Sequence, residues 1–310
     1  MPGLSTLCPP LNSDSPSQSI FFVETSGHKC LTARQACSVE SAARMNPDLP
    51  VRVYQHDRPI AGSKINSHLP GQKRNCDVTE ALQREFRNVH LIREDLAVHL
   101  EGTPLWKLYA QGKLNESQYP LMHWSDAVRA AILRKYGGIY LDLDCTVLRP
   151  LHCLQNTVGL VDYIPHWVEN GVMIFDAGHP FLDFLMKYMV FAFKPDEYIS
   201  LGPATLTDAI KYFCDTEHLL PSLVYQCRHN GTLSLQPHTA FYSIANNRQE
   251  SFYQSQWDAS LLDQLRDSYL SHIYDAGNGR RVHTDSLYAF LSREHCPTTY
   301  SMATQQADGF

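Results

Sequence analysis

The sequence has no long apolar run and no recognisable leader segment. The longest apolar run is Tyr188–Phe193, and a lysine flanks it on each side. A membrane-spanning helix needs roughly 20 apolar residues, so we expect this chain as given not to cross a membrane. Residues 1–20 lack the charged start and the apolar stretch of a signal peptide.

The chain also has no basic cluster and no internal repeat. Lys and Arg number 26 against 32 Asp and Glu, which gives a formal net charge of −6. This balance argues against binding to a nucleic-acid backbone. Apolar residues make up 44% of the 310 residues and charged residues 19%, so general disorder is excluded and a large core is expected. The length fits one large domain or two small ones.

Cysteine usage points to an oxidising compartment. The nine cysteines include no C-x-x-C pair, which argues against a structural zinc site. Two N-glycosylation sequons begin at Asn115 and Asn230. Together, the cysteines and the sequons favour a lumenal or secreted domain over a cytosolic one.

An odd number of cysteines leaves at least one thiol without a partner inside the chain. Cys214 and Cys227 bracket a short loop and are the first disulfide candidate. Cys37 with Cys76 is the second. Cys145 lies inside a strand pattern and is expected to be a buried free thiol.

Short strand patterns alternate with helical ones along the first half of the chain, whereas residues 1–18, rich in Ser and Pro, predict a flexible stem or tail. The alternation predicts an α/β domain with a mostly parallel sheet flanked by helices. The expected strands are Ile20–Glu24, Val51–Tyr54 and Val89–Leu91, and the expected helices are Cys37–Met45 and a short one from Thr103 to Leu108, with a loop over Gly62–Cys76.

The segment Ser125–Pro150 is the most informative part of the sequence. Ser125 is a plausible N-cap of a helix that stops at Gly137. Residues Ile139–Leu148 then have the composition of a strand. On a strand, Tyr140, Asp142 and Asp144 share one face. This places two carboxylates at the carboxyl end of a central strand, where open α/β sheets bind ligands.

Two carboxylates close together repel each other and need compensation. A divalent cation supplies it, as in nucleotide-sugar transfer, where the metal would bridge the donor diphosphate. A phosphatase of the haloacid-dehalogenase type is an alternative, with Asp142 as nucleophile and Asp144 as acid/base, but the later acidic pair that it needs is missing after Val147. A third reading has both acids simply solvated at the end of the strand.

Asp126 and Arg129 lie three residues apart and therefore on one face of the preceding helix. A surface ion pair would explain them and would contribute little. They also suit a sugar clamp, in which Asp126 accepts hydrogen bonds from hydroxyls and Arg129 donates to a sugar oxygen or a phosphate.

Ser125-Asp126-x-x-Arg129 followed by Tyr136-Gly137-Gly138-Ile139-Tyr140-x-Asp142-x-Asp144 resembles the DXD signature of the animal α1,4-glycosyltransferase family. The likeness runs from about Phe21 to Tyr300. Further segments support it: Phe21–Ser26, Cys37–Arg44, Thr103–Leu105, Glu169–Gly171, Leu201–Pro203, Ala240–Ile244 and Cys296–Tyr300.

The resemblance implies a GT-A fold and a retaining hexosyltransferase. The implied cofactor is Mn2+, with Mg2+ as an alternative, and the implied donor is a UDP-sugar, namely UDP-galactose or a UDP-N-acetylhexosamine. The acceptor would be the terminal sugar of a glycosphingolipid such as lactosylceramide, or of a glycoprotein. A front-face displacement, in which the leaving phosphate oxygen takes the proton of the acceptor hydroxyl, would need no carboxylate nucleophile.

The resemblance also implies a type II Golgi membrane protein whose anchor is absent from this chain. Residues 19–160 would form the half that binds the donor through the DXD motif. Residues 161–302 would form the acceptor-side half, and 303–310 a tail.

Carried over by position, the resemblance assigns a role to each matching residue. Asp144 is the direct metal ligand, Asp142 contacts the ribose and the metal, and His272 is a third ligand or a diphosphate contact. Asp126, Arg129 and Tyr140 belong to the donor site with Tyr274, and Asn170, Gly171, Leu201 and Gly202 form the acceptor side. Phe22, Glu24 and Thr25 border the uridine pocket.

Three positions depart from the family pattern. Leu201 stands where a glutamine would lie near the reacting sugar, and Tyr274 and Asp275 replace a tryptophan and an asparagine. An amide could steady positive charge at the anomeric carbon, which a leucine cannot. These departures support a rival hypothesis, in which the chain is a catalytically impaired relative that binds a UDP-sugar without transferring it.

Overall fold

The computed structural model describes residues 8, 18–60, 76–221, 223–275, 280–305 and 310. Most of the expected stem, apart from Cys8 and Gln18, lies outside the described residues. So does the expected loop after Gly62 as far as residue 75, and most of the expected tail. Among the described residues, no helix has both the length and the apolar character needed to cross a membrane.

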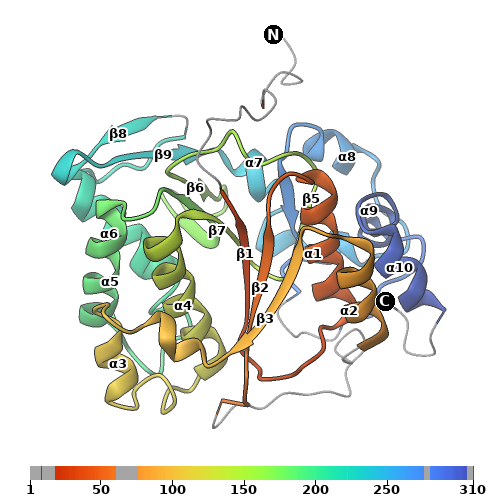
Figure 1. Ribbon diagram of the computed structural model, residues 1–310. Coiled ribbons are helices and arrows are strands. Elements are labelled where there is room, and N and C mark those ends of the chain that lie inside the picture. The colour runs from red at the N-terminus through yellow and green to blue at the C-terminus, as the bar shows by residue number, and fades with distance from the viewer. Residues whose placement is uncertain (1–7, 9–17, 61–75, 222, 276–279, 306–309) are drawn as a thin grey trace.

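An eight-stranded mixed sheet forms the centre of the molecule (Figure 1). Its strand order is β3-β2-β1-β4-β7-β6-β9-β8, and the first four strands are parallel. β7 runs antiparallel to both β4 and β6. The strands are β1 (Ile20–Glu24), β2 (Val51–His56), β3 (Val89–Glu94), β4 (Gly138–Leu141), β6 (Thr157–Leu160), β7 (Val168–Phe175), β8 (Val224–Gln226) and β9 (Thr232–Gln236).

Two groups of helices cover the two faces of the sheet (Figure 1). One face carries α3 (Trp106–Ala110), α4 (Pro120–Tyr136), α5 (Pro180–Ala192) and α6 (Pro203–Cys214). The other carries α1 (Ala33–Met45), α2 (Cys76–Glu85), α9 (Leu287–His295) and α10 (Pro297–Thr304). Short helices complete the chain: α7 (His238–Phe241), α8 (Ser260–Leu265), and the 3-10 turns η1 (Leu96–His99), η2 (Arg228–Asn230) and η3 (Asn246–Phe252).

The side chains of β1 and β4 alternate between two cores. Phe21 and Tyr140 pack into the core under α4, α5 and α6. Phe22 and Ile139 pack into the core under α1. Both strands are buried on both faces, as expected for central parallel strands. The sequence therefore predicted the α/β class correctly, and β1 has the expected bounds.

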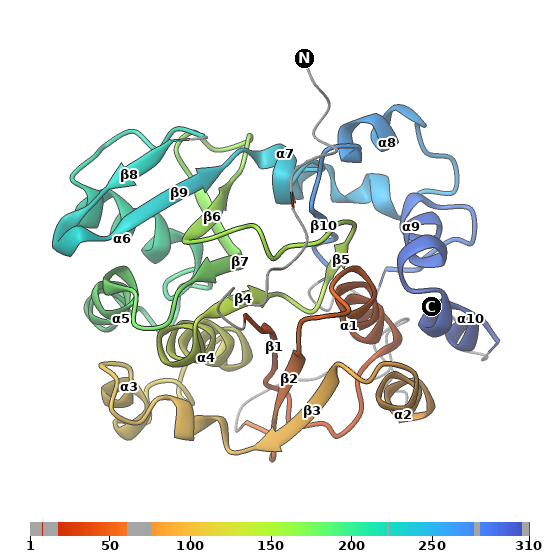
Figure 2. The same cartoon turned by 45° about the horizontal axis from the view of Figure 1, so that its top comes forward.

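The expected strand Ile139–Leu148 is wrong in one respect, because it is two strands. β4 ends at Leu141, the chain turns over Asp142–Asp144, and β5 (Cys145–Val147) pairs antiparallel with β10 (Leu270–His272) in a separate small sheet. Figure 2 shows β5 and β10 side by side next to α1. The turn carries the DXD motif out of the main sheet, which sequence composition could not reveal.

Helix α4 begins earlier than expected. Its first residue is Pro120 and its N-cap is Tyr119, so Ser125 lies inside the helix and is not its cap. Proline suits a first helical position because it lacks the N–H that would find no partner there. The predicted end is correct: Gly137 caps the helix with φ 64°, and a Cβ there would lie 2.4 Å from the Ala177 backbone nitrogen.

Four disulfides link distant parts of the chain: Cys8–Cys153, Cys30–Cys76, Cys37–Cys296 and Cys214–Cys227. The Cys214–Cys227 prediction is confirmed, and Cys145 is free and buried as expected. The Cys37–Cys76 prediction is wrong. Cys37 in the middle of α1 faces the start of α10, and the partner of Cys76 is Cys30, just before α1.

Candidate active site

The turn after β4 brings the two aspartates of the DXD motif to the carboxyl end of the parallel strands. The backbone N–H of Asp142 donates to the Gly171 carbonyl at 2.8 Å, and the N–H of Cys145 donates to the Asp142 carbonyl at 3.2 Å. The Tyr140 hydroxyl donates to Asp142 Oδ1 at 2.7 Å. These bonds hold Asp142 between β4 and β7.

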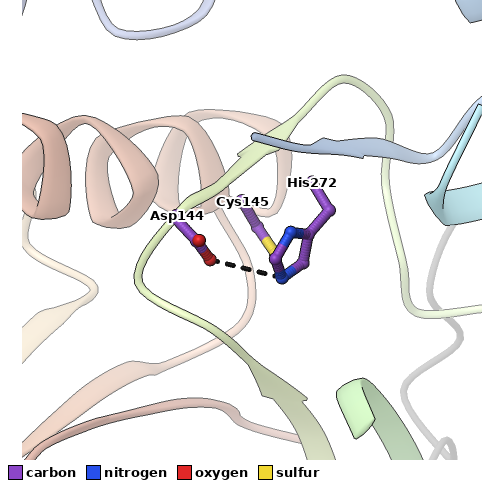
Figure 3. A group of neighbouring side chains, drawn as sticks. All are labelled: Asp144, Cys145 and His272. Carbon is purple, nitrogen blue, oxygen red and sulfur yellow. Dashed lines mark ion pairs between the residues drawn. The ribbon is translucent and has the colours of Figure 1, made fainter. Parts of the chain in front are cut away.

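His272 reaches the same point from the end of β10. It is the register partner of Cys145, so their side chains lie next to each other on the small sheet. His272 Nε2 lies 3.3 Å from Asp144 Oδ1 and 3.5 Å from Asp142 Oδ2. Figure 3 shows the imidazole turned towards Asp144, with the Cys145 sulfur beside it. The structure thus brings together all three predicted metal ligands.

The charges of this group are strongly coupled. Burial raises the pKa of Asp144 to about 6, although His272 opposes the shift. Burial would lower the pKa of His272, but Asp144 and Asp142 outweigh it and raise the pKa to about 8. Burial would also raise the pKa of Asp142, yet Arg129 and His272 lower it to about 2. Near neutral pH the imidazolium therefore balances the carboxylates.

A divalent cation fits this group of side chains. Ligand atoms of Asp144, Cys145 and His272 lie within 4.8 Å of one another, and Asp142 borders them. Oxygen and imidazole donors suit a divalent metal, which would replace the proton of His272 as the compensating charge. Burial, together with the carboxylates, raises the pKa of the Cys145 thiol well above its usual value, so Asp144 and His272 are the stronger ligands.

A second group of polar residues, also buried, lies beside the first. Asp126 and Arg129 on α4 form an ion pair at 3.3 Å, with 5% and 2% of their surfaces exposed, so the surface ion-pair reading is wrong. Asn170 Nδ2 donates to Asp126 Oδ1 at 2.7 Å. Arg129 Nη1 lies 3.1 Å from Asp142 Oδ1 and donates to the Asn170 carbonyl at 2.8 Å.

Each of the three guanidinium nitrogens of Arg129 has a protein partner. Besides the contacts above, Nε donates to the Ser125 carbonyl and Nη2 to the Ser125 hydroxyl. The guanidinium also lies 4.4 Å from the centre of the Tyr140 ring. Burial raises the pKa of Asp126, and Arg129 and Asn170 oppose that shift. Arg129 therefore ties the DXD turn to the α4 carboxylate.

A small pocket opens between the Asp126–Arg129–Asn170 group, called the clamp below, and the helices α5 and α6. Its free volume of about 10 Å³ holds about one water molecule. Leu201 lines it with Asp126, Arg129 and Asn170, and Leu185, Met189 and Leu206 close its apolar side. A Cβ on Gly202 would lie 3.1 Å from Asp126 Oδ2. Leu201 and Gly202 thus border the carboxylate of the clamp.

Gly171 lies against the other group. A Cβ there would come within 2.8 Å of His272 Nε2 and 2.9 Å of Asp142 Oδ2. The strand pairing between β6 and β7 shifts at this point, because Val158 pairs with Met173 while Gly159 pairs with Glu169. Such a bulge re-aims side chains and is common beside active sites. It places Asn170 against Asp126, and Gly171 against Asp142 and His272.

The remaining predicted residues surround these two groups. Phe22 is fully buried in the core. Glu24 and Thr25, at the carboxyl end of β1, are buried too. The Thr25 hydroxyl donates to the Leu121 carbonyl at 3.0 Å. Asn115 and Asn230, the asparagines of the two sequons, are both exposed.

The departures after His272 have structural partners. The backbone N–H of Tyr274 donates to His272 Nδ1 at 3.2 Å, and that of Asp275 donates to Asp144 Oδ2 at 2.9 Å. The Asp275 carboxylate forms a buried ion pair with Arg34 at 2.8 Å. Arg34 on α1 therefore neutralises the Asp275 carboxylate, and the Asp275 backbone N–H positions Asp144.

The sequence analysis missed several residues near the site, namely Arg34, Glu169 and Tyr198. The fields of Asp126 and Asp142 add to burial and raise the pKa of Tyr198 to about 12. Arg34 and Tyr198 lie in segments with no motif, so spacing along the chain gave no signal for them. Glu169 is part of the Glu169–Gly171 segment that supported the resemblance, but the sequence analysis assigned no role to it.

Comparison with known proteins decides the family. Residues 32–163 match a glycosyltransferase sugar-binding region containing the DXD motif, and residues 174–303 match an alpha 1,4-glycosyltransferase conserved region. Lactosylceramide 4-alpha-galactosyltransferase of Pan troglodytes is 32% identical over 96% of this chain and 81% of its own length. The chain belongs to the α1,4-glycosyltransferase family.

Other relatives agree with this membership. Lactosylceramide 4-alpha-galactosyltransferase of Mus musculus is 32% identical over 91% of the chain and 75% of its own length. Human alpha-1,4-N-acetylglucosaminyltransferase is 29% identical over 91% and 80%. Among solved structures, the ligand-free glycosyltransferase domain of the YGT toxin aligns with a TM-score of 0.48 at 10% identity, covering 94% of this chain and 91% of its own.

Family membership confirms that the chain is a hexosyltransferase. The structure confirms the expected α/β sheet. A DXD-containing glycosyltransferase implies a nucleotide-sugar donor and a divalent metal. The phosphatase reading of Asp142 and Asp144 is wrong, because the motif belongs to a sugar-binding region.

Proposed function

We propose that the chain transfers galactose from UDP-galactose, in α1,4 linkage and with retention, to the terminal sugar of a glycosphingolipid such as lactosylceramide. A UDP-N-acetylhexosamine is the alternative donor. One observation carries the proposal: the Asp126–Arg129–Asn170 clamp shares Arg129 with the Asp142–Asp144–His272 group. The sugar and the diphosphate of one donor can therefore contact both groups at once.

Each residue has a proposed task. Asp126 Oδ2 faces Gly202, where it accepts hydrogen bonds from the hydroxyls of the donor sugar. Tyr140 and Arg129 hold Asp142, which contacts the ribose. Because its nitrogens already have partners, Arg129 acts by fixing the two carboxylates and by lending positive charge to the diphosphate. Glu24 and Thr25 border the uridine at the end of β1.

Asp144 and His272, with Asp142 beside them, would hold Mn2+, with Mg2+ as the alternative. When bound, the metal neutralises charge on a diphosphate leaving group. The acceptor hydroxyl attacks the anomeric carbon from the face that the diphosphate leaves, and its proton passes to the leaving phosphate oxygen. The bond from the anomeric carbon to that oxygen breaks as the new glycosidic bond forms.

We place the donor in residues 19–160 and the acceptor against residues 161–302. We also propose a Golgi lumenal location. The four disulfides support an oxidising compartment. The exposure of Asn115 and Asn230 supports glycosylation at both sequons.

A binding-only relative is the second candidate, and Leu201 is the observation that favours it. Its side chain lines the pocket beside Asp126, where the family pattern has an amide. Such a chain would bind UDP-sugar but would not transfer the sugar.

The test is UDP release by the purified chain with Mn2+ over a panel of UDP-sugars, with and without lactosyl glycolipid. Selective release that the glycolipid stimulates supports the transferase and identifies its donor. Saturable UDP binding without release from any donor, in a folded and metal-loaded sample, supports the binding-only candidate instead.

A further inference from the structure

Glu169 is a partly buried carboxylate beside the active site for which the proposed reaction has no use. It lies near the start of β7, directly before Asn170 and Gly171. Asn170 contacts Asp126 of the clamp, and Gly171 lies against Asp142 and His272. Burial raises its pKa, and hydrogen bonds from Tyr163 and Trp167 oppose the shift. The Tyr163 hydroxyl donates to Glu169 Oε1 at 2.9 Å.

The strand register sets the direction of the Glu169 side chain. Glu169 pairs with Gly159 on β6, and paired residues project to the same side of a sheet. A Cβ on Gly159 would lie 2.7 Å from the rings of both Phe241 and Tyr242. Glu169 therefore points to the side of the sheet where Tyr242 lies.

Tyr242 connects this carboxylate to the reaction centre. Its ring centre lies 5.7 Å from that of His272 and 6.4 Å from that of Tyr274. Its hydroxyl is buried and has no hydrogen-bond partner among the described residues. A buried hydroxyl without a partner costs about 1–3 kcal/mol, which favours a site that a polar ligand completes. Tyr274, which has a φ of 57°, packs its ring against those of Tyr242 and His272.

The segment before Glu169 is apolar, aromatic and accessible. Residues 161–167 connect β6 to β7 and include Tyr163, Ile164 and Trp167. Ile164 is 38% exposed, and Tyr163 and Trp167 are partly buried. Aromatic rings that flank a positioned carboxylate suit a pyranose, which has apolar C–H faces and a belt of hydroxyl donors.

The charge of this site selects its ligand. A third carboxylate close to Asp142 and Asp144 repels a diphosphate, whereas it accepts hydrogen bonds from a neutral sugar. Asn170 and Glu169 are consecutive on β7, but Asn170 contacts Asp126 whereas Glu169 contacts Tyr163. The region around Asp126 and the region around Glu169 are therefore neighbouring but separate places for a sugar. The donor sugar takes the region at Asp126.

We propose that Glu169, with Tyr163 and Trp167 beside it, forms the subsite that binds the acceptor sugar. This inference rests on the proposed transfer to a glycan acceptor. Glu169 accepts hydrogen bonds from acceptor hydroxyls, and Tyr163 and Trp167 hold the carboxylate in place. Two lone pairs of the carboxylate serve these residues, which leaves capacity for the sugar.

The test compares the wild type with Glu169→Gln and with a matched control, Glu85→Gln. Glu85 is an exposed acid on α2 that pairs only with its neighbour Arg84 in the described structure. Methyl β-lactoside is the soluble acceptor, with UDP-galactose and Mn2+. We expect Glu169→Gln to raise the KM for methyl β-lactoside about tenfold or more, since a hydrogen bond to a charged group is lost.

The dissociation constant of UDP, measured by calorimetry, should stay within about twofold for both variants. A Glu169→Gln enzyme with unchanged acceptor KM would overturn the inference. Equal weakening of UDP and lactoside would also overturn it, because Glu169 would then serve the donor site. If Glu169→Gln fails to fold, Tyr163→Phe provides the second test and should raise the acceptor KM with UDP binding intact.

A binding measurement separates this inference from the proposed function. Saturation-transfer NMR with methyl β-lactoside, UDP and Mg2+ reports acceptor binding without any turnover. If the wild type transfers no sugar but binds the lactoside, and Glu169→Gln abolishes the binding, the subsite stands and the transferase proposal fails. Absence of lactoside binding to a folded wild type refutes the subsite itself.

Discussion

Gly171→Ala should weaken metal binding without unfolding the protein. The new Cβ would lie 2.8 Å from His272 Nε2 and 2.9 Å from Asp142 Oδ2, whereas an ordinary contact is 3.4 Å or longer. Both side chains, or the backbone that carries the new Cβ, must therefore shift, by about 0.5 to 0.6 Å in all. The backbone of Gly171 is not in the left-handed region, so alanine adopts it without strain.

We expect His272 to move further than Asp142. Asp142 is held by short contacts with Tyr140 at 2.7 Å and Arg129 at 3.1 Å. The imidazole of His272 accepts from the Tyr274 N–H at 3.2 Å, and its Nε2 lies 3.3 Å and 3.5 Å from the two aspartates, so its contacts are longer. Displacing a residue that orients or ligates a metal costs about 10–100-fold in affinity. This corresponds to about 1.4–2.7 kcal/mol.

Calorimetric titration with Mn2+ in the presence of UDP measures this loss, and thermal unfolding of the metal-free protein measures stability. Gly231→Ala is the control, because its Cβ would meet the Phe213 ring at 3.0 Å, on a different part of the molecule. Wild-type Mn2+ affinity in a folded Gly171→Ala protein would refute the placement of His272 and Asp142 against Gly171. A comparable loss in Gly231→Ala would show that crowding alone is responsible.

Four further predictions follow from the same contacts. Asp144→Asn should abolish metal-dependent UDP release, and near-normal release would exclude Asp144 as a ligand. Arg129→Ala leaves the buried Asp126 carboxylate and the partly buried Asp142 carboxylate without their partner and should cost about 3 kcal/mol in chemical denaturation; a loss below about 1 kcal/mol would contradict the buried network. Mn2+ affinity should rise with pH between about 6 and 8, as protons leave Asp144 and His272. Over the same change the metal-free protein should lose stability, because the pKa of His272 lies above its unfolded value of about 6.5 and its imidazolium stabilises the fold only at lower pH; a flat titration would refute the coupling. Replacing Cys37 and Cys296 by serine should cost about 2.6 kcal/mol more than replacing Cys214 and Cys227, since the bridges span 259 and 13 residues. Equal losses in denaturation would contradict this entropic reasoning.

The sequence by itself determined the chemistry of the site. Asp126, Arg129, Asp142 and Asp144 lie in one short stretch of sequence. The helix period was enough to place Asp126 and Arg129 on one helix face, whereas Asp142 and Asp144 lie in a turn that the strand period did not predict. The alternation of strand patterns with helical patterns predicted the α/β class, and a short apolar run predicted the bounds of β1. Gly137 marked the end of α4 because its conformation is a local property of the backbone.

Only the tertiary structure decided what surrounds those residues. His272 reaches Asp144 through the pairing of β10 with β5, and Arg34 neutralises Asp275 across 241 residues of sequence. The division of one expected strand into β4 and β5, the bulge that aims Asn170 and Gly171 at different groups, and the partner of Cys37 also depend on such distant contacts. Sequence periodicity reports the face on which a residue lies. Which distant segment packs on that face is decided by the total of buried contacts in the folded chain, and no single stretch of sequence contains that information.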